Sequence, residues 1–503
     1  MNQSASFSNS KPSGPENQFL LNETVPKNGS TPRGTRKNVD FHEKQPLFER
    51  PSEPVRLTPA WEETNLPNDE LNFKSVTMEQ VDMEMNPPTD RLKLVYFTLL
   101  IHGVGTLMPW NMFINAKAYF VHYKLAKVYT GVDSEYARNF LPYVGFAAQI
   151  PNLLFNWLNI FVQMGGNLTT RIVWSIIVEV CVFIFTVTLA MSDSSSWPGV
   201  FFWLTMVTVV ILNMANGIYQ NTVFGMAAKL PFKYTGAVIL GANISGTFSS
   251  LISILSLAMA PNPRTAAIYY FITALFVLLA CFDTYFALPL NRFYRYHELL
   301  NEKEKQSQRR ANVGLAPHTP YWTIFLQCLP QLFNVFFVFF ITLSLFPSVH
   351  SDIKRSDKNF IISDHYFTEV TCFLTFNVCA MLGSLLSAWV TWPGPKHLVI
   401  FVVLRVLFIP FFLACNYVPL NRNRLIPVFI ENDYVYWAGA VLMGLTSGHF
   451  SSLAMMYCPR SVEPQHAATA GMFGAAALVT GIFSGIVVTM VFPELVARFE
   501  WKL

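Results

Sequence analysis

The chain has 503 residues, of which 52% are hydrophobic, 15% are aromatic and only 13% are charged. Soluble globular proteins carry about a quarter charged residues, so this composition excludes an ordinary soluble domain and indicates a polytopic membrane protein. The formal net charge of +4 comes from basic residues scattered between apolar runs, which gives no support to nucleic-acid binding.

The first 91 residues are rich in Ser, Pro, Asn, Glu and Lys, and we expect them to form a disordered cytosolic tail. No cleavable signal peptide is expected, because this stretch lacks an apolar core of the required length. Within the tail, Glu16, Leu20 and Leu21 have the acidic-x-x-x-Leu-Leu spacing of an endosomal sorting signal that binds clathrin adaptors. A pattern this short also arises by chance, so both interpretations stay open.

A membrane-spanning helix needs about 20 apolar residues to cross ~30 Å of hydrocarbon. Eleven stretches of this chain are long enough, and the sequence therefore predicts an all-α polytopic membrane protein with eleven transmembrane helices. The expected spans are 92–117, 139–163, 170–191, 198–228, 234–260, 265–288, 322–346, 366–391, 398–417, 434–456 and 466–492.

The loop 289–321 carries six basic residues and is expected to be cytoplasmic by the positive-inside rule. It divides the spans into six and five, the layout of a major-facilitator-like carrier in which two bundles rock about a central site. The expected domains are a cytosolic tail at 1–91, a six-helix bundle at 92–288, the cytoplasmic loop at 289–321, a five-helix bundle at 322–492 and an exterior tail at 493–503.

The first span ends in glycine, proline, indole and amide, where a purely lipid-facing helix would carry leucine and valine. Gly103 and Gly105 permit close helix approach, and Pro109 bends the segment. Trp110 and Asn111 add an aromatic face and a hydrogen-bonding amide. These are the parts of a small-molecule site, and an interfacial tryptophan followed by a kink is the alternative.

Two further spans carry stripes of amide side chains at helical spacing. The second span has Gln149, Asn152, Asn156 and Asn159, and the fourth has Asn213, Asn216 and Gln220. Amides suit a neutral polar solute better than an ion. Hydrogen bonding between helices is the alternative interpretation.

Other spans have small residues at four-residue spacing, which favours close packing between helices. In the fifth span these are Ala237, Gly241 and Ser245. The eleventh span repeats the pattern with Gly481 and Gly485.

Each ionisable residue in a span requires a structural or functional explanation, because a charge at bilayer depth costs about 2.5 to 3.5 kcal/mol on insertion scales. His102 and Glu179 can carry protons, or they are polar residues satisfied inside the bundle. Arg405 is expected to be a buried structural cation. We recognise no arrangement of catalytic residues in the sequence, so we do not expect an enzyme. The seven cysteines lack metal-ligand spacing, and we expect neither a metal nor another cofactor.

From about residue 92 to the C-terminus, the chain resembles the equilibrative nucleoside transporter family. The matching stretches are 105–111, 219–225, 230–231, 234–235, 241–246, 293–296, 372–377, 392–394, Arg405 and 469–471. The resemblance implies eleven spans, a cytosolic N-terminus, an exterior C-terminus and downhill transport of nucleosides by alternating access.

The resemblance also implies a nucleoside cavity, in which Gln220 would bond the base edge and Trp110 would pack beside the solute. The cavity positions carried over to this chain are Trp110, Gln220 and Asn377, with Gln149, Asn216, Thr222, Phe373 and Ile482 as neighbours.

The eighth span departs from the family pattern. Ala380 and Ser384 stand where the family has an aspartate and a basic residue on the ribose side, and with Ala388 they form another small stripe. Either Asn377, Ser384 and a charged residue elsewhere contact the ribose, or the solute is a nucleobase or another small molecule.

The sequence thus predicts a facilitative nucleoside carrier of the plasma membrane, with an endosomal or lysosomal membrane as the alternative address. The expected partners are a nucleoside, the lipid bilayer and, through the tail, a clathrin adaptor. The competing functions are a proton-coupled nucleoside or nucleobase carrier that uses Glu179 or His102, and a purine receptor without transport.

Overall fold

The computed structural model describes residues 85–116, 119–131, 136, 140–162, 167–259, 263–311, 319–419 and 424–498. The candidate sorting signal of Glu16, Leu20 and Leu21 lies outside these residues. Every element described below belongs to the compact unit of residues 75–503.

The described residues form a helical segment at every position where the sequence predicts a span. The first six are α3 (Leu94–Asn115), α7 (Phe140–Phe161), α8 (Leu168–Met191), α9 (Pro198–Ala227), α10 (Lys233–Met259) and α11 (Pro263–Ala287). Later ones are α13 (Tyr321–Leu345), α19 (Asp433–Tyr457) and α20 (Ala467–Thr489).

The remaining two spans are built from shorter pieces. The eighth comprises α15 (Asp364–Thr368), the π-helical turn η5 (Glu369–Leu374) and α16 (Thr375–Leu386). The ninth comprises α17 (Leu398–Leu404), the 3-10 turn η6 (Arg405–Leu407) and α18 (Phe408–Ala414).

By length and composition, eight described helices can cross a membrane, and Leu398–Ala414 is a shorter apolar segment. Helices α7 and α19 also reach spanning length, with 22 and 25 residues, but their amide, serine and threonine side chains lower their hydropathy. The predicted all-α polytopic membrane protein is confirmed.

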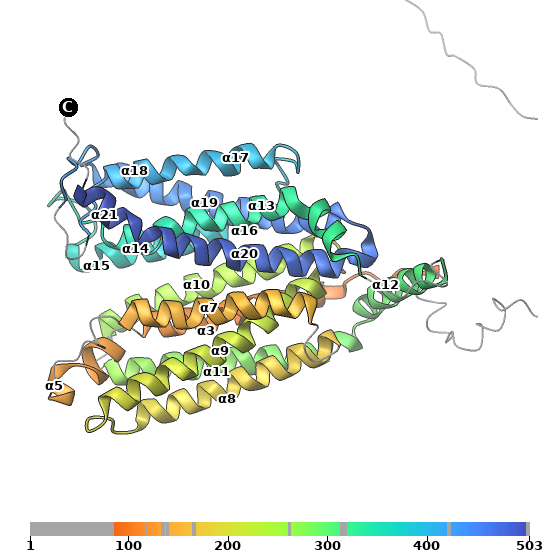
Figure 1. Ribbon diagram of the computed structural model, residues 1–503, viewed down its shortest axis with the longest axis horizontal. Coiled ribbons are helices and arrows are strands. Elements are labelled where there is room, and N and C mark those ends of the chain that lie inside the picture. Colours follow the sequence, from red (N-terminus) through yellow and green to blue (C-terminus); the bar gives the residue numbers. More distant parts are fainter. Residues whose placement is uncertain are drawn as a thin grey trace, which may run out of the picture. The chain divides into compact units, whose positions relative to one another are not determined.

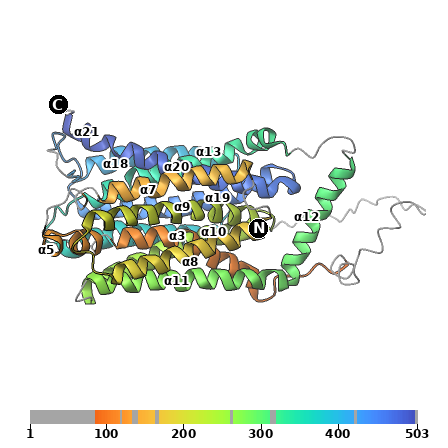
Figure 2. The ribbon, with the colours of Figure 1, turned by 60° about the horizontal axis from the view of Figure 1, so that its bottom comes forward.

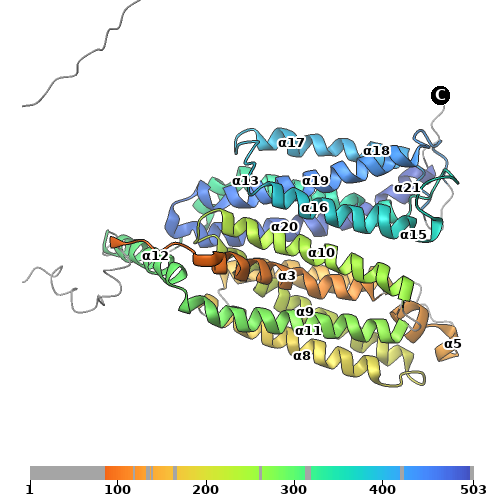
Figure 3. The ribbon, with the colours of Figure 1, turned by 180° about the vertical axis from the view of Figure 1, so that it is seen from behind.

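The long helices run in one general direction and fall into two groups (Figure 1). The first helix group contains α3 and α7 to α11, and the second contains α13 and α15 to α20. Helix α10 packs against α3 within its own group and also against α16 and α19 of the second, as the reverse view shows (Figure 3). Helix α20 packs against α13 and reaches across to α7 and α9. Contacts between the groups therefore depend largely on α10 and α20.

The ends of the helix groups differ. At one end, the charged helix α12 (Arg292–Ala311) crosses beyond the ends of the long helices, from the α11 side toward the α13 side (Figure 2). It contacts the short turn η8 (Pro464–His466). The short helices α5 (Lys127–Thr130), α14 (Ser348–Ser351) and α21 (Val491–Arg498) lie at the other end. The polar loop expected from the sequence is thus largely a helix.

Helices α3 and α10 approach each other backbone to backbone. A Cβ atom on Gly103 would overlap the backbone of Val238, and one on Gly241 would overlap that of Leu100. The close packing predicted from Gly241 and its small neighbours is confirmed. Helix α20 packs equally closely on α13, because Gly481 and Gly485 face the backbone of α13.

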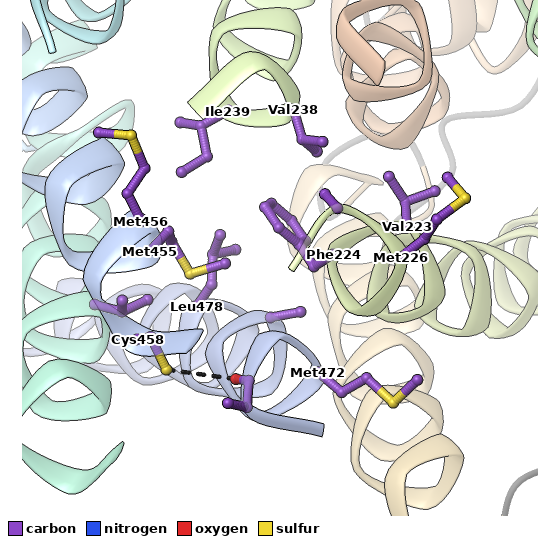
Figure 4. Close-up of a cluster of buried hydrophobic side chains, with 14 of the residues drawn as sticks. Val223, Phe224, Met226, Val238, Ile239, Met455, Met456, Cys458, Met472 and Leu478 are labelled. Atoms are coloured by element: carbon purple, nitrogen blue, oxygen red, sulfur yellow. Dashed lines mark hydrogen bonds between the residues drawn. The ribbon is translucent and has the colours of Figure 1, made fainter. Parts of the chain in front are cut away.

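At the α12 end, α9, α10, α19 and α20 meet in a buried apolar cluster that we call the methionine seam (Figure 4). Its labelled members are Val223, Phe224, Met226, Val238, Ile239, Met455, Met456, Cys458, Met472 and Leu478. The seam joins two helices of each group through apolar side chains.

Candidate solute-binding site

Helices α7 and α9 lie side by side, and residues of the predicted amide stripe of α7 bond Asn221 and Thr222 of α9. Asn156 Nδ2 donates to Asn152 Oδ1 at 2.9 Å, and Asn221 Nδ2 donates to Asn156 Oδ1 at 3.2 Å. Asn159 Nδ2 donates to Asn221 Oδ1 at 2.9 Å and to the Thr222 hydroxyl at 3.1 Å. We call these five residues the amide ladder. The α7 stripe thus bonds one helix to another, through α9 residues that lie outside the predicted α9 stripe.

The ladder is anchored at both sides. Arg171 Nη1 on α8 donates to Asn159 Oδ1 at 3.3 Å, and Asn221 Nδ2 also donates to the Met472 carbonyl of α20 at 2.9 Å. Thr222, predicted as a cavity neighbour, donates its own proton to the Ile218 carbonyl at 2.6 Å. Its hydroxyl is therefore occupied within the protein.

Three other residues of the predicted stripes have amide oxygens without a partner. Gln149 Oε1, Asn216 Oδ1 and Gln220 Oε1 are buried and have no hydrogen-bond partner in the described part of the chain. Their side chains are 5%, 1% and 3% exposed, respectively. A buried polar group without a partner costs about 1 to 3 kcal/mol, so these three oxygens are acceptors that a solute or water can satisfy.

The two side chains of the first-span motif, Trp110 and Asn111, differ in their contacts. Asn111 Nδ2 donates to Ser245 Oγ on α10 at 3.1 Å, which ties α3 to α10. Trp110 is half-buried and packs beside the apolar core of the first helix group. Of the pair, Trp110 is therefore the candidate solute contact.

The candidates on α16 are bonded to α10. Asn377 Nδ2 donates to Ser250 Oγ at 2.9 Å and to the Phe373 carbonyl at 2.9 Å. Asn243 Nδ2 donates to Ser384 Oγ at 2.6 Å, and Ser384 Oγ donates to the Gly448 carbonyl at 3.2 Å. We call the bonds Asn377–Ser250 and Asn243–Ser384 the α10–α16 latch. It connects the two helix groups.

The small stripe of α16 packs tightly on α19. A Cβ atom on Gly448 would overlap the Ala380 carbonyl, and one on Gly383 would overlap the Leu445 carbonyl. The close packing expected from Ala380 and Ser384 is confirmed at Ala380.

The two remaining predicted neighbours lie in apolar surroundings. The Phe373 ring is 5.8 Å from the Phe346 ring, centroid to centroid. Ile482 on α20 is half-buried against the core that joins both groups. Two residues before Ile482, the Thr480 hydroxyl accepts a hydrogen bond from Trp157 Nε1 at 3.0 Å. The sequence did not indicate this link between α7 and α20.

Arg405 lies apart from these residues, on the outer side of the second group. Its Nη1 donates to Thr446 at 3.2 Å and its Nη2 to Thr342 at 2.7 Å, while its Nε is buried without a partner among the described residues. It lines a cavity of about 360 Å³ with Phe408 and other apolar side chains of α17 to α19. None of the predicted solute contacts lines this cavity.

His102 and Glu179 lie in the interior of the first helix group and are 0% exposed. Both are separate from the amide ladder and from the α10–α16 latch.

Comparison with known proteins gives a consistent result. Residues 206–494 match the family model of the nucleoside transporters. Human equilibrative nucleoside transporter 1 is 29% identical over 455 residues, which cover 81% of this chain and 99% of that protein. Equilibrative nucleoside transporter 3 of Rattus norvegicus is 31% identical over 399 residues, covering 75% of this chain and 83% of that protein.

A plant protein and a solved structure extend the comparison. Equilibrative nucleotide transporter 1 of Arabidopsis thaliana is 28% identical over 407 residues, covering 78% of this chain and 84% of that protein. The structure of the major facilitator superfamily proton:xylose symporter XylE matches with a TM-score of 0.58 and 11% identity, over 81% of this chain and 90% of that one. At this identity the match shows the fold alone, and it confirms the predicted major-facilitator-like architecture.

Proposed function

Because the chain belongs to the equilibrative nucleoside transporter family, we propose that it moves nucleosides down their concentration gradient by alternating access between its two helix groups. The family consists of transporters and not of enzymes.

The solute is recognised by the free amide oxygens of the first helix group. Gln149, Asn216 and Gln220 each offer a buried acceptor that nothing else in the described chain uses. A nucleoside presents N–H and O–H donors on its base and ribose, and it is neutral, as uncharged amides require. Gln220 accepts from the base edge, and Trp110 packs beside the ring. The unpartnered Gln220 oxygen is the single observation that carries this assignment.

Alternating access requires contacts between the groups to break on one side of the solute and then on the other. The α10–α16 latch and the methionine seam are two such contacts. The latch lies from the middle of α10 toward its far end, and the seam lies at the α12 end. Each latch bond contributes about 0.5 to 1.5 kcal/mol net, which is small enough to break in each cycle.

The orientation of the chain in the membrane is inferred from the charge of α12, and its location in the cell from the tail. We place the α12 end in the cytoplasm because Arg292, Arg295 and Lys303 belong to α12. The N-terminus is then cytosolic and the C-terminus exterior. The plasma membrane is the proposed location. In the endosomal alternative, a clathrin adaptor binds the tail, and imaging of a chain with Leu20 and Leu21 replaced by alanine tests it. A wild-type chain in endosomes that moves to the surface in this variant would support that alternative.

Uptake into vesicles containing the purified full-length chain tests the function. Radiolabelled uridine and adenosine should equilibrate across the membrane. Their uptake should exceed the uptake into protein-free vesicles. Faster uptake of uracil or adenine than of the nucleosides would favour the nucleobase alternative. Solute binding without flux would favour a receptor and contradict the proposal.

A further inference from the structure

The cavity around Arg405 has no role in the nucleoside transport proposed above. It measures about 360 Å³ and is lined by side chains of α17, η6, α18 and α19. This volume lies within the range of small-molecule sites. Its walls include Leu404, Leu407 and Leu442, which are 53%, 65% and 55% exposed on the outer side of the second helix group. In a membrane, the cavity therefore opens toward the lipid acyl chains.

Arg405 is the charged member of the cavity wall and is itself only 2% exposed. Its guanidinium carbon lies 5.9 Å from the centroid of the Phe408 ring, and its Nη1 donates to the Thr446 hydroxyl at 3.2 Å. Phe408 and Thr446 also line the cavity. The guanidinium group is thus held at the cavity wall by two of its lining side chains.

The charge of Arg405 lacks a counter-ion, and one of its donors lacks an acceptor. Among the described residues, no carboxylate forms an ion pair with Arg405, and its Nε–H is buried without a partner. A buried cation is costly unless an anion pairs with it. The Thr446 hydroxyl is already engaged, because it donates its own proton to the Leu442 carbonyl at 2.8 Å.

The apolar walls decide what can satisfy this donor. Cavities lined by apolar side chains stay dry, so water is a poor partner for Nε. Phe401, Phe411 and Phe450 are among the apolar residues of the lining. A ligand that fits both features carries an anionic oxygen for Arg405 and an apolar body for the rest of the cavity.

The depth of Arg405 in the membrane restricts the kind of anion. The seven residues of α17 precede it in the ninth span, which places it about 10 Å inside that span at 1.5 Å per residue. Its bonds to Thr342 of α13 and Thr446 of α19 hold it at this depth. A phospholipid keeps its phosphate at the membrane surface and cannot bring that anion to Arg405.

A free fatty acid meets these requirements. Its carboxyl group enters hydrocarbon as the neutral acid, and its single chain is apolar. Beside a fixed cation the carboxylate form is favoured, so the O–H bond breaks and the proton is released to water. Hydrogen bonds from a guanidinium to a carboxylate are charge-assisted and about twice as strong as neutral ones.

We propose that this cavity binds a long-chain fatty acid from the bilayer. The carboxylate accepts the free Nε–H bond of Arg405 and supplies the missing negative charge, while the chain lies against Phe408, Phe411 and Leu442. Arg405 also bonds α13 and α19, so the bound acid completes a polar contact that joins three segments of the second helix group. The proposal does not depend on the transport of nucleosides.

A photoactivatable diazirine analogue of palmitic acid tests the site on the purified full-length chain in lipid nanodiscs. After photolysis, mass spectrometry should find the label on peptides from Leu398–Ala414 or Asp433–Tyr457. Unlabelled palmitic acid should compete at least about tenfold better than hexadecanol, which has the same chain length and no charge. Equal competition by the acid and the alcohol, or labelling confined to other helices, would overturn the proposal.

Other lipids serve as competitors in the same assay. Phosphatidic acid and cholesterol should each compete at least about tenfold less well than palmitic acid, because neither brings an anion to the depth of Arg405. If either lipid competed as well as palmitic acid, the cavity would be a site for that lipid and the fatty-acid assignment would be wrong.

Substitution of the cation tests its part in binding. In Arg405→Gln, the advantage of palmitic acid over hexadecanol should fall to less than about twofold, because the charge is lost. Arg405→Lys keeps a positive charge and should retain most of the preference for the acid. A wild-type preference in Arg405→Gln would show that Arg405 does not bind the carboxylate.

A second variant leaves Arg405 unchanged and decides the question if Arg405→Gln does not fold. Leu442→Trp fills the cavity from its lipid-facing side and should reduce labelling of α17 to α19 at least about fivefold. Leu279→Trp is the matched control, since Leu279 is 40% exposed on α11 and does not line the cavity. This control should be labelled like the wild type. Undiminished labelling of Leu442→Trp would contradict the proposed site.

Discussion

Two sets of predicted solute contacts differ in how their hydrogen bonds are used. On α7 and α9, Gln149, Asn216 and Gln220 are buried with unpaired amide oxygens. On α16, Asn377 and Ser384 are bonded to α10. An unpaired acceptor gains a bond when a solute arrives, whereas a paired one must first give up its partner. We therefore propose that the first set recognises the solute, whereas the second set bonds α16 to α10 in this conformation.

The clearest test of this difference is Gln220→Ala. Loss of a hydrogen bond worth about 1.4 kcal/mol should raise the KM for uridine about tenfold, with protein yield unchanged. Asn213→Ala is the matched control, because Asn213 Nδ2 on the same helix bonds its own Val209 carbonyl at 2.8 Å. An unchanged KM in Gln220→Ala would place the site elsewhere.

The Asn243–Ser384 bond of the latch should affect turnover rather than affinity. Asn243→Ala should change the maximal uptake rate about fivefold and leave KM nearly constant, because the bond contributes about 1 kcal/mol to one conformation. A double-mutant cycle with Ser384→Ala should recover this coupling. Strict additivity of the two substitutions would show that the bond has no role in the cycle.

Asn377 and Ser250 provide the sharpest comparison within the latch. If Asn377 acts only through Ser250, Asn377→Ala and Ser250→Ala should change the maximal rate by the same factor, about threefold. Both KM values should match that of the wild type. A raised KM for Asn377→Ala alone would return Asn377 to the set of solute contacts.

The smallest effect is expected at the α7–α20 link. Trp157→Phe keeps an aromatic ring and removes the bond from Trp157 Nε1 to Thr480 Oγ1. At about 0.5 kcal/mol, the maximal rate should change by only about twofold. Thr480→Val should change the maximal rate by the same factor. A tenfold change in either variant would show that this link contributes to the cycle as strongly as the latch does.

Much of the fold was predictable from the sequence because it depends on local patterns. Apolar length gave the positions of the long helices, and four-residue spacing of small side chains gave the tight contacts at Gly241 and Gly481. The π-helical turn η5 and the 3-10 turn at Arg405 were not predicted, since no residue pattern in the eighth or ninth span indicates a change of helix type.

The site was predictable only in part, because identical residue types at identical spacing acquire different partners. Asn156 and Gln220 both belong to amide stripes, yet Asn156 is bonded to Asn221 and Gln220 keeps a free oxygen. The difference arises from the register of α7 against α9, which the sequence of one helix does not contain. Asn243 and Ser250 were missed because they lie on a helix whose small residues indicated packing alone.

The methionine seam has a consequence for the speed of the cycle. Its members meet through apolar surface, and Met455, Met456 and Met472 have unbranched, adaptable side chains. The free energy of parting such surfaces grows with the area exposed to water, at about 25 cal/mol per Å². In the proposed cycle, opening of the α12 end is therefore a wetting transition, in which water must fill a dry gap before a solute can follow. The height of that barrier should respond to temperature and hardly to ionic strength.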